Sequence, residues 1–285
     1  MMDLKKKQKT NITVDFNNLN EKHLSIQLSL DGFSFCIINK IEKQVENLEH
    51  FSFQDNSPSP EQLLKNVEEL FRKEKALQNR YGSVNISHVN QLSTLVPKSL
   101  FDEERIRDYL KFSSKTYTND YLVYDELENH DMVNVYIPFV NVNNFFLQRF
   151  GSFEYKHSST IFVNTLLNTF KFSEHPHMFA HISEHQFEIM VISHDKLMFF
   201  NSFTFQTKED FIYYILFTAE QLELNPENFE LVLAGNIDME SDFYKIAYSY
   251  VRKVSLLENR SELKFSSNIK EETRRKYFTL LNQYI

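Results

Sequence analysis

Residues Met178–Asn236 read MFAHISEHQFEIMVISHDKLMFFNSFTFQTKEDFIYYILFTAEQLELNPENFELVLAGN. Short polar breaks separate three strand-like runs, of which the second and third are rich in β-branched and aromatic residues. This pattern predicts antiparallel strands at Phe179–Ser183, Phe187–Ser193 and Leu197–Phe205. Thr207 suits the N-cap of a following helix, because acidic residues occupy the next turn. The apolar run Phe229–Ala234, which ends at Gly235, predicts another strand. The predicted order is β-β-β-α-β.

The helix predicted after Thr207 carries seven consecutive apolar or aromatic residues, Phe211–Phe217. A helix at a protein surface shows an apolar stripe, whereas a helix that is apolar all round is covered on several sides. We therefore expect this helix to lie on the sheet and beneath a second layer. The run is too short to cross a bilayer.

The same order of elements is predicted near the start of the chain. Leu24–Leu30 alternates apolar and polar residues, and Asp31-Gly32 predicts a type I′ hairpin turn before the return strand. Ser59 and Pro60 predict the start of a helix, with Gln62 as the capping-box partner of Ser59. The remaining predicted strands and the apolar face of this helix are Phe33–Ile41, Val45–Phe53, Val84–Val89, and Leu63, Val67, Leu70 and Phe71.

The middle and the end of the chain are less regular. Leu95–Phe101 is predicted to be a loop and turn that enters a helix at Asp102–Phe112. The acidic segment Asp125–Asp131 is predicted to be a solvated loop between two strands. Asn141–Phe150 predicts a short helix, and Lys270–Tyr284 predicts an amphipathic closing helix.

Composition limits the possible functions. The net charge of −8 argues against a protein that grips nucleic acid by neutralising many phosphates. Cys36 is the single cysteine, so no internal disulfide can form, and we expect it to be a buried small hydrophobe. The amino terminus shows no secretory signal and no apolar run is long enough to span a membrane, so the sequence predicts a cytoplasmic protein.

A β-β-β-α-β-α-β order used twice resembles the duplicated ribonuclease-H-like fold of the actin-like ATPase superfamily. The details are similar to a bacterial family of uncharacterised proteins with that fold; the matching segments are the Leu24–Ile41 hairpin, Ser93–Phe101 and Phe199–Asn236. The resemblance implies an α/β protein with two ribonuclease-H-like subdomains and mixed sheets, and no established activity. The implied division is a flexible basic tail at 1–15 and subdomains at 16–157 and 158–285.

ATPases of this superfamily hold phosphates in two acidic, glycine-bearing hairpins, and a glycine-rich segment approaches the adenosine. Backbone amides can approach phosphate oxygens closely only where no Cβ intervenes. By resemblance, ATP and Mg²⁺ would be held by Asp31 and Gly32 in the first hairpin, by Glu184 in the second and by Gly235 near the adenosine. The second hairpin has no glycine, so one of the two hairpins expected to hold phosphate lacks the residue that admits it.

Two functional hypotheses follow. The leading one is a non-catalytic cytoplasmic scaffold that binds a protein partner through its cleft, an apolar face or a strand edge, with no cofactor and no nucleic acid. The alternative is a divergent Mg-ATP binding protein or ATPase that uses Asp31, Gly32, Glu184 and Gly235 in the cleft between the subdomains. No catalytic residue or metal ligand is predicted, because the clustered histidines lack a metal-binding spacing: His175, His177, His181, His185 and His194.

Overall fold

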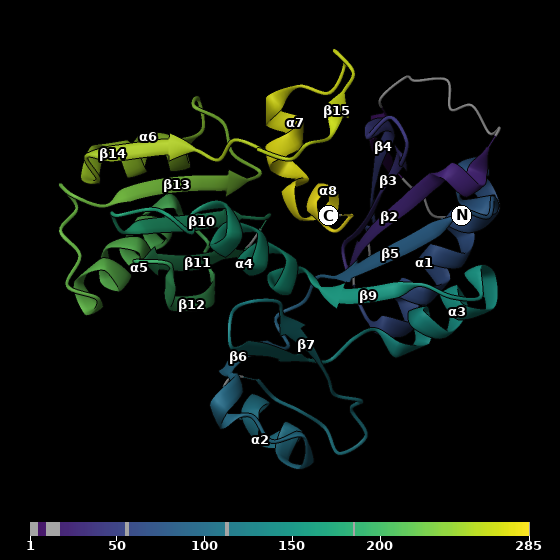
Figure 1. Cartoon of the computed structure of the whole chain (residues 1–285), viewed down its shortest axis with the longest axis horizontal. Coiled ribbons are helices and arrows are strands. Elements are labelled where there is room, and N and C mark those ends of the chain that lie inside the picture. Colours follow the sequence, from purple (N-terminus) through teal and green to yellow (C-terminus); the bar gives the residue numbers. More distant parts are fainter. Residues whose placement is uncertain (1–4, 10–17, 55–56, 112–113, 185, 285) are drawn as a thin grey trace. The chain divides into compact units, whose positions relative to one another are not determined.

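The computed structural model describes residues 5–9, 18–54, 57–111, 114–184 and 186–284 (Figure 1). The chain forms two compact units. Unit 1 comprises Met1–Phe162, Ser261–Ile269 and Thr279–Ile285, and unit 2 comprises Val163–Arg260 and Lys270–Phe278. The division into subdomains at 157 and 158 stays a prediction, as does the basic tail, in which Lys5–Lys9 forms strand β1 and the other residues lie outside the described part.

A seven-stranded mixed sheet is the centre of unit 1. Its main path runs β1-β4-β3-β2-β5-β9, and β15 pairs with β4. Strands β2, β3 and β4 are antiparallel, whereas β5 and β9 run parallel to β2 and to each other. The strands are β2 (Lys22–Ser29), β3 (Gly32–Asn39), β4 (Gln44–Ser52), β5 (Ser83–His88), β9 (Glu154–His157) and β15 (Lys264–Phe265).

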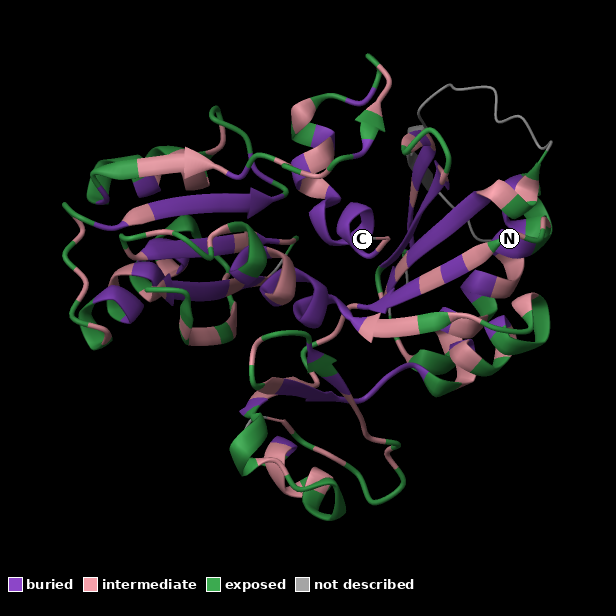
Figure 2. Cartoon of the chain, in the orientation of Figure 1, coloured by how far each residue is buried: buried purple, intermediate pink, exposed green. Residues whose placement is uncertain are grey.

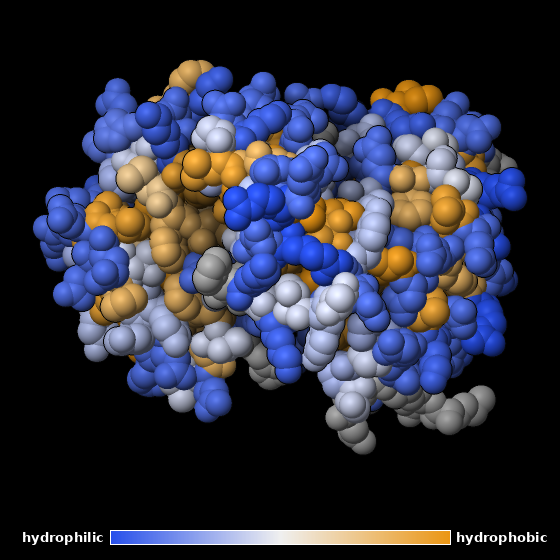
Figure 3. Space-filling model, turned by 90° about the horizontal axis from the view of Figure 1, so that it is seen from below, coloured by the Kyte–Doolittle hydropathy of each residue, from blue (hydrophilic) through white to orange (hydrophobic). Residues whose placement is uncertain are grey.

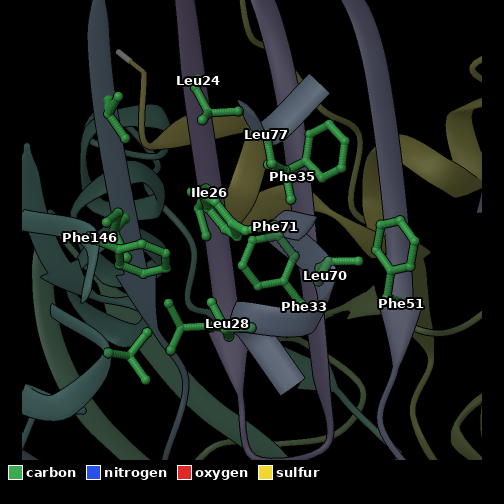
Figure 4. Packing of buried hydrophobic residues seen from close by; sticks show 14 of the residues in the cluster. Leu24, Ile26, Leu28, Phe33, Phe35, Phe51, Leu70, Phe71, Leu77 and Phe146 are labelled. Carbon is green, nitrogen blue, oxygen red and sulfur yellow. The ribbon is translucent and has the colours of Figure 1, made fainter. Parts of the chain in front are cut away.

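Helices α1 (Pro60–Lys73) and α3 (Val140–Phe150) cover one face of this sheet. Ser59 is the N-cap of α1 and accepts a hydrogen bond from the Gln62 amide at 3.2 Å. Alternate residues of β2 and β3 pack against the four apolar side chains predicted for α1, all of which are buried (Figure 4). Phe71 also meets Phe146 of α3, with ring centroids 5.7 Å apart. The predicted first repeat, β-β-β-α-β, is thus confirmed.

A smaller three-stranded sheet follows β5 in unit 1, with the order β6-β8-β7. Strand β6 (Ser93–Pro97) includes the first three residues of the predicted Leu95–Phe101 loop, because all five residues of β6 pair with β8. Of the predicted helix at Asp102–Phe112, Phe112 lies outside the described residues, and among the described ones only α2 (Ile106–Leu110) is α-helical. The other strands and the 3-10 turns of unit 1 are β7 (Val123–Leu127), β8 (Met132–Tyr136), Leu19–Glu21, Lys75–Gln78, Lys98–Leu100 and Glu103–Arg105.

The five-stranded sheet of unit 2 has the order β12-β11-β10-β13-β14. Strands β10 to β12 are antiparallel, and β13 and β14 run parallel to β10. The strands are therefore arranged as β4-β3-β2-β5-β9 are in unit 1. The elements of unit 2 are β10 (His177–Ile182), β11 (Gln186–Ser193), β12 (Lys196–Thr204), α5 (Lys208–Gln221), β13 (Glu230–Gly235), α6 (Asp242–Tyr250), β14 (Lys253–Leu256) and α7 (Glu271–Lys276); α4 (Ser158–Thr169) begins in unit 1 and continues in unit 2.

Helix α5 begins at the predicted N-cap. The Thr207 hydroxyl accepts a hydrogen bond from the Asp210 amide, and the Asp210 carboxylate accepts one from the Thr207 amide. The buried residues of α5, coloured purple in Figure 2, pack on the sheet. The prediction that the helix is covered on several sides is wrong for two of its seven apolar residues, since Tyr213 is 60% and Phe217 is 44% exposed.

Two further sequence-based expectations need correction. The closing helix is broken at Tyr277, so that α7 belongs to unit 2 and α8 (Phe278–Asn282) lies almost wholly in unit 1. In unit 1, the Thr279 hydroxyl donates to the Gln27 side chain at 2.6 Å. The type I′ turn at Asp31-Gly32 is also wrong, because Gly32 already belongs to β3 and the two loop residues, Leu30 and Asp31, do not have positive φ.

Candidate functional site

The hairpin between β2 and β3 carries the first pair of predicted nucleotide-binding residues. The Asp31 carboxylate accepts a hydrogen bond from the Ser29 hydroxyl at 2.5 Å. The backbone carbonyl of Asp31 accepts one from the Phe53 amide at 2.8 Å. A Cβ atom on Gly32 would lie 3.1 Å from Cε1 of His50 and 3.2 Å from the carbonyl oxygen of Phe51. The close approach of β4 therefore favours glycine at this position without any ligand.

The second pair of predicted residues lies at one end of the sheet in unit 2. Ile182, the last residue of β10, pairs with Gly235, the last residue of β13. Glu184 is exposed in the loop that directly follows β10, where the Ser183 amide donates to the Gln186 carbonyl at 2.8 Å. Glu184 and Gly235 thus lie at the same end of this sheet.

The backbone around Gly235 leaves less room for a side chain than the backbone around Gly32 does. The φ of Gly235 is +85°, a conformation that residues with a Cβ rarely adopt. A Cβ atom would also lie only 2.2 Å from the carbonyl oxygen of Ile182. That oxygen accepts a hydrogen bond from the Asn236 amide at 2.8 Å. The junction after β13 is therefore closed by the backbone of β10.

Asp125 anchors a buried polar cluster that the sequence did not predict. Its carboxylate accepts hydrogen bonds from the Tyr136 hydroxyl at 2.9 Å, the His157 amide at 2.8 Å and the Thr160 hydroxyl at 2.7 Å. The predicted solvated loop is wrong here, because Asp125 lies in β7 and is only 9% exposed. Strand parity was the available signal, since Asp125 shares a face with the buried Leu127.

Burial sets the charge state of the groups around Asp125. It raises the pKa of the Asp125 carboxyl, although the Thr160 hydroxyl and the His157 amide oppose the shift. Burial and the negative charge of Asp125 raise the pKa of Tyr136, which therefore stays protonated as a donor. The Asp125 carboxylate is engaged by three protein donors within unit 1. Its role is to join β7 to the junction between β9 and α4.

Two fully buried histidines, His88 and His157, pair at the ends of β5 and β9 beside this cluster. His88 Nδ1 accepts a hydrogen bond from the Phe139 amide at 3.3 Å. Burial, reinforced by His157, lowers the pKa of His88 to about 3. His88 is therefore neutral near pH 7 and serves as a core residue of unit 1.

The histidines of unit 2 are distributed among different partners. His181 Nδ1 lies 3.0 Å from the Glu188 carboxylate, and His177 Nε2 lies 3.3 Å from that of Glu230. His185 lies outside the described residues. Within the described ranges, no group of three or more His, Cys, Asp or Glu side chains is placed to hold a metal ion. Across those same ranges, no helix has the length and apolar character needed to cross a membrane.

A family model described as "Protein of unknown function (DUF3822)" matches residues 11–254. Among solved structures, the chain is similar to a Bacteroides thetaiotaomicron VPI-5482 protein described as having an actin-like ATPase fold and unknown function. The TM-score is 0.77 at 26% identity, over 86% of this chain and 94% of that one.

A second solved structure, the PilM-PilN type IV pilus biogenesis complex, shares the fold at a TM-score of 0.61 and 12% identity. The match covers 91% of this chain and 96% of that one. No curated protein matches the sequence. Together with the strand orders, these likenesses show an actin-like ATPase fold built from two ribonuclease-H-like subdomains.

Proposed function

We propose that this chain, which belongs to the DUF3822 family and has an actin-like ATPase fold, is a non-catalytic cytoplasmic module that binds a protein partner. One observation carries the proposal: three of the four residues that resemblance assigns to a nucleotide are used in the packing or turn geometry of their own unit. The fourth, Glu184, lies in a hairpin that has no glycine.

The first hairpin shows this use in unit 1. Gly32 allows β4 to approach, and the Asp31 carboxylate is engaged by Ser29 within the turn. Neither feature requires a phosphate or a metal ion. The residues that look like a remnant of a nucleotide site therefore have a sufficient structural reason to be present.

The strand ends of unit 2 support the same interpretation. A phosphate cradle needs backbone amides directed at the ligand. The Asn236 amide instead donates to Ile182, and Gly235 permits the close approach of β10. The loop that contains Glu184 has side chains with a Cβ at every position, which keeps its backbone away from phosphate oxygens.

Two further points bear on the partner and the compartment. A protein of this fold occurs in the PilM-PilN complex, so the fold is compatible with assembly between proteins. The single cysteine, Cys36, is fully buried, and burial raises the pKa of its thiol. A chain without disulfides suits a reducing compartment.

Titration calorimetry of the intact chain with ATP and ADP, each with Mg²⁺, tests the proposal. We expect no saturable heat up to about 1 mM nucleotide, which would exclude a Kd much below about 1 mM. Binding that disappears in Asp31→Ala would overturn the proposal. Asp195→Ala, which removes another acidic residue from a hairpin turn, is the matched control.

The alternative is a divergent Mg-ATP binding protein. The observation in its favour is that Glu184 and Gly235 share one end of the sheet in unit 2. In that case Asp31 and Glu184 would face Mg²⁺, while Gly32 and Gly235 would admit the phosphates and the adenosine. Saturable heat that is lost in both Asp31→Ala and Glu184→Ala would establish this alternative.

A further inference from the structure

Five aromatic rings form a continuous row in unit 2, of which two are exposed and three are half-buried against the core. We call Phe199, Phe203, Tyr214, Tyr213 and Phe217 the aromatic ridge. Successive ring centroids are 6.4 Å (Phe199–Phe203), 4.6 Å (Phe203–Tyr214), 5.4 Å (Tyr213–Tyr214) and 5.9 Å (Tyr213–Phe217) apart. The first two residues lie on β12 and the other three on α5. Apolar side chains are visible on the surface of unit 2, on the left of Figure 3.

The ridge borders an open strand edge. Within the described part of the chain, β12 pairs only with β11 and is the outer strand of the sheet. Proteins commonly protect such an edge with proline, charged side chains or very short strands. Strand β12 is nine residues long and has no proline, and its one charged residue, Lys196, is at its start. The pairing with β11 has one register shift, between Val191 and Ile192, and the Ser202 amide donates to the Asn201 side chain at 2.9 Å. The other unpaired backbone groups of β12 are available to another strand.

Acidic residues flank the exposed end of the ridge. Glu209, Tyr213, Phe217 and Glu220 are spaced along one face of α5, and all four are exposed. The basic residue next to Glu209, Lys208, lies 3.9 Å from Asp242 of α6. The exposed rings are thus bounded by a negative charge on either side.

These charges select among possible occupants. Two copies of the chain packed antiparallel through α5 would bring Glu209 of one copy against Glu220 of the other, which is unfavourable. Single-stranded nucleic acid can stack on aromatic residues, but it needs basic neighbours for its phosphates. A segment with apolar and positively charged side chains can pack on the aromatic rings and pair with the two glutamates.

We propose that β12 and the aromatic ridge bind an extended basic and apolar segment of a partner protein, which adds to the sheet as a strand. This inference deepens the proposed function and rests on it. The rise along α5 from Glu209 to Glu220 is about 16 Å. A strand covers that length in about five residues. Because residues on one face of a strand alternate, the partner carries two Lys or Arg residues four or six positions apart.

Selection from a phage-displayed library of random peptides about ten residues long, enough for one strand, tests the proposal on the intact chain. We expect the enriched peptides to alternate apolar residues and to carry Lys or Arg at the predicted spacing. A synthetic copy of an enriched peptide should bind about tenfold more weakly to the double variant Tyr213→Gln/Phe217→Gln. The charge-reversed variant Glu209→Lys/Glu220→Lys should show a similar loss.

Leu147→Gln removes a comparably exposed apolar side chain from α3 of unit 1 and should leave peptide binding unchanged. Failure to enrich peptides, enrichment without basic residues, or equal binding by the ridge variants would each overturn the proposal. Light scattering that showed a dimer dissociated by the ridge variant would also overturn it, in favour of a second copy of the chain. Nucleotide calorimetry is a separate readout, so failure of the proposed function is distinguishable from failure of this surface.

Discussion

Helices α1 and α5 occupy the same place in the two repeats, yet their outer faces differ. After Pro60, the exposed positions of α1 are all charged: Glu61, Lys65, Arg72 and Lys73. In the middle of α5, the exposed positions are Tyr213 and Phe217. Both helices bury apolar side chains against their own sheet, so this burial does not explain the difference.

Packing against its own sheet therefore does not account for the exposed aromatic residues of the second repeat. A charged outer face costs nothing in water, whereas exposed aromatic side chains at adjacent helical turns gain free energy when another surface covers them. In unit 1, α3 packs beside α1, and Phe71 is covered by Phe146. In unit 2, α6 covers only part of α5, through Phe211 and Phe243. The uncovered part of α5 carries Tyr213 and Phe217, the exposed residues of the aromatic ridge.

Substitution of Gly235 and Gly32 by alanine should give the largest difference in stability between the two repeats. Gly235→Ala forces a Cβ against a backbone oxygen at a positive φ, so we expect a loss of about 4 kcal/mol in unfolding free energy. Gly32→Ala meets the His50 ring at 3.1 Å and the Phe51 carbonyl oxygen at 3.2 Å, at an ordinary φ, and should cost about 1 kcal/mol. Urea unfolding measures both. Equal losses would show that the two strand ends are equally constrained.

Acid should weaken unit 1 through His23. Burial, and secondarily the charge of Lys40, lowers the pKa of His23 from 6.5 to about 4. The unfolded chain therefore takes up this proton first as the pH falls, so stability is lost between about pH 6.5 and 4. The loss amounts to about 3 kcal/mol.

Urea midpoints measured across that pH range should fall less in His23→Gln than in the natural chain. His194→Gln, an exposed change in the turn between β11 and β12, serves as the control in unit 2. An unchanged acid dependence in His23→Gln would assign the loss to another group, and His88 is the next to test.

Asp125→Ala should cost about 2 kcal/mol of unfolding free energy. It leaves the Tyr136 and Thr160 hydroxyls without their buried acceptor, but it also removes a charge that burial disfavours. Glu126→Ala, at the next and exposed position of β7, should cost less than about 1 kcal/mol. Similar losses in the two variants would mean that the buried cluster does not anchor the smaller sheet.

Sequence periodicity predicted those elements whose neighbours along the chain determine them. The repeated β-β-β-α-β order, the caps at Ser59 and Thr207 and the apolar face of α1 were all predictable, because each depends on local spacing. The polar environment of Asp125 was not, since its donors come from three separate elements. Nor could the sequence show that Gly235 meets Ile182, a contact that depends on the pairing of β10 with β13.

The smallest effect on stability is expected for the exposed aromatic residues of α5, where the two repeats differ most. Tyr213→Gln with Phe217→Gln should change the unfolding free energy by less than about 1 kcal/mol, because both side chains are exposed and glutamine is a good helix former. Ile215→Ala, at a fully buried position of the same helix, should cost about 3 kcal/mol. If the double variant cost as much as Ile215→Ala, the aromatic ridge would be stabilising this chain itself. A small effect on stability together with a large effect on peptide binding would instead separate the ridge from the core and assign it to a partner.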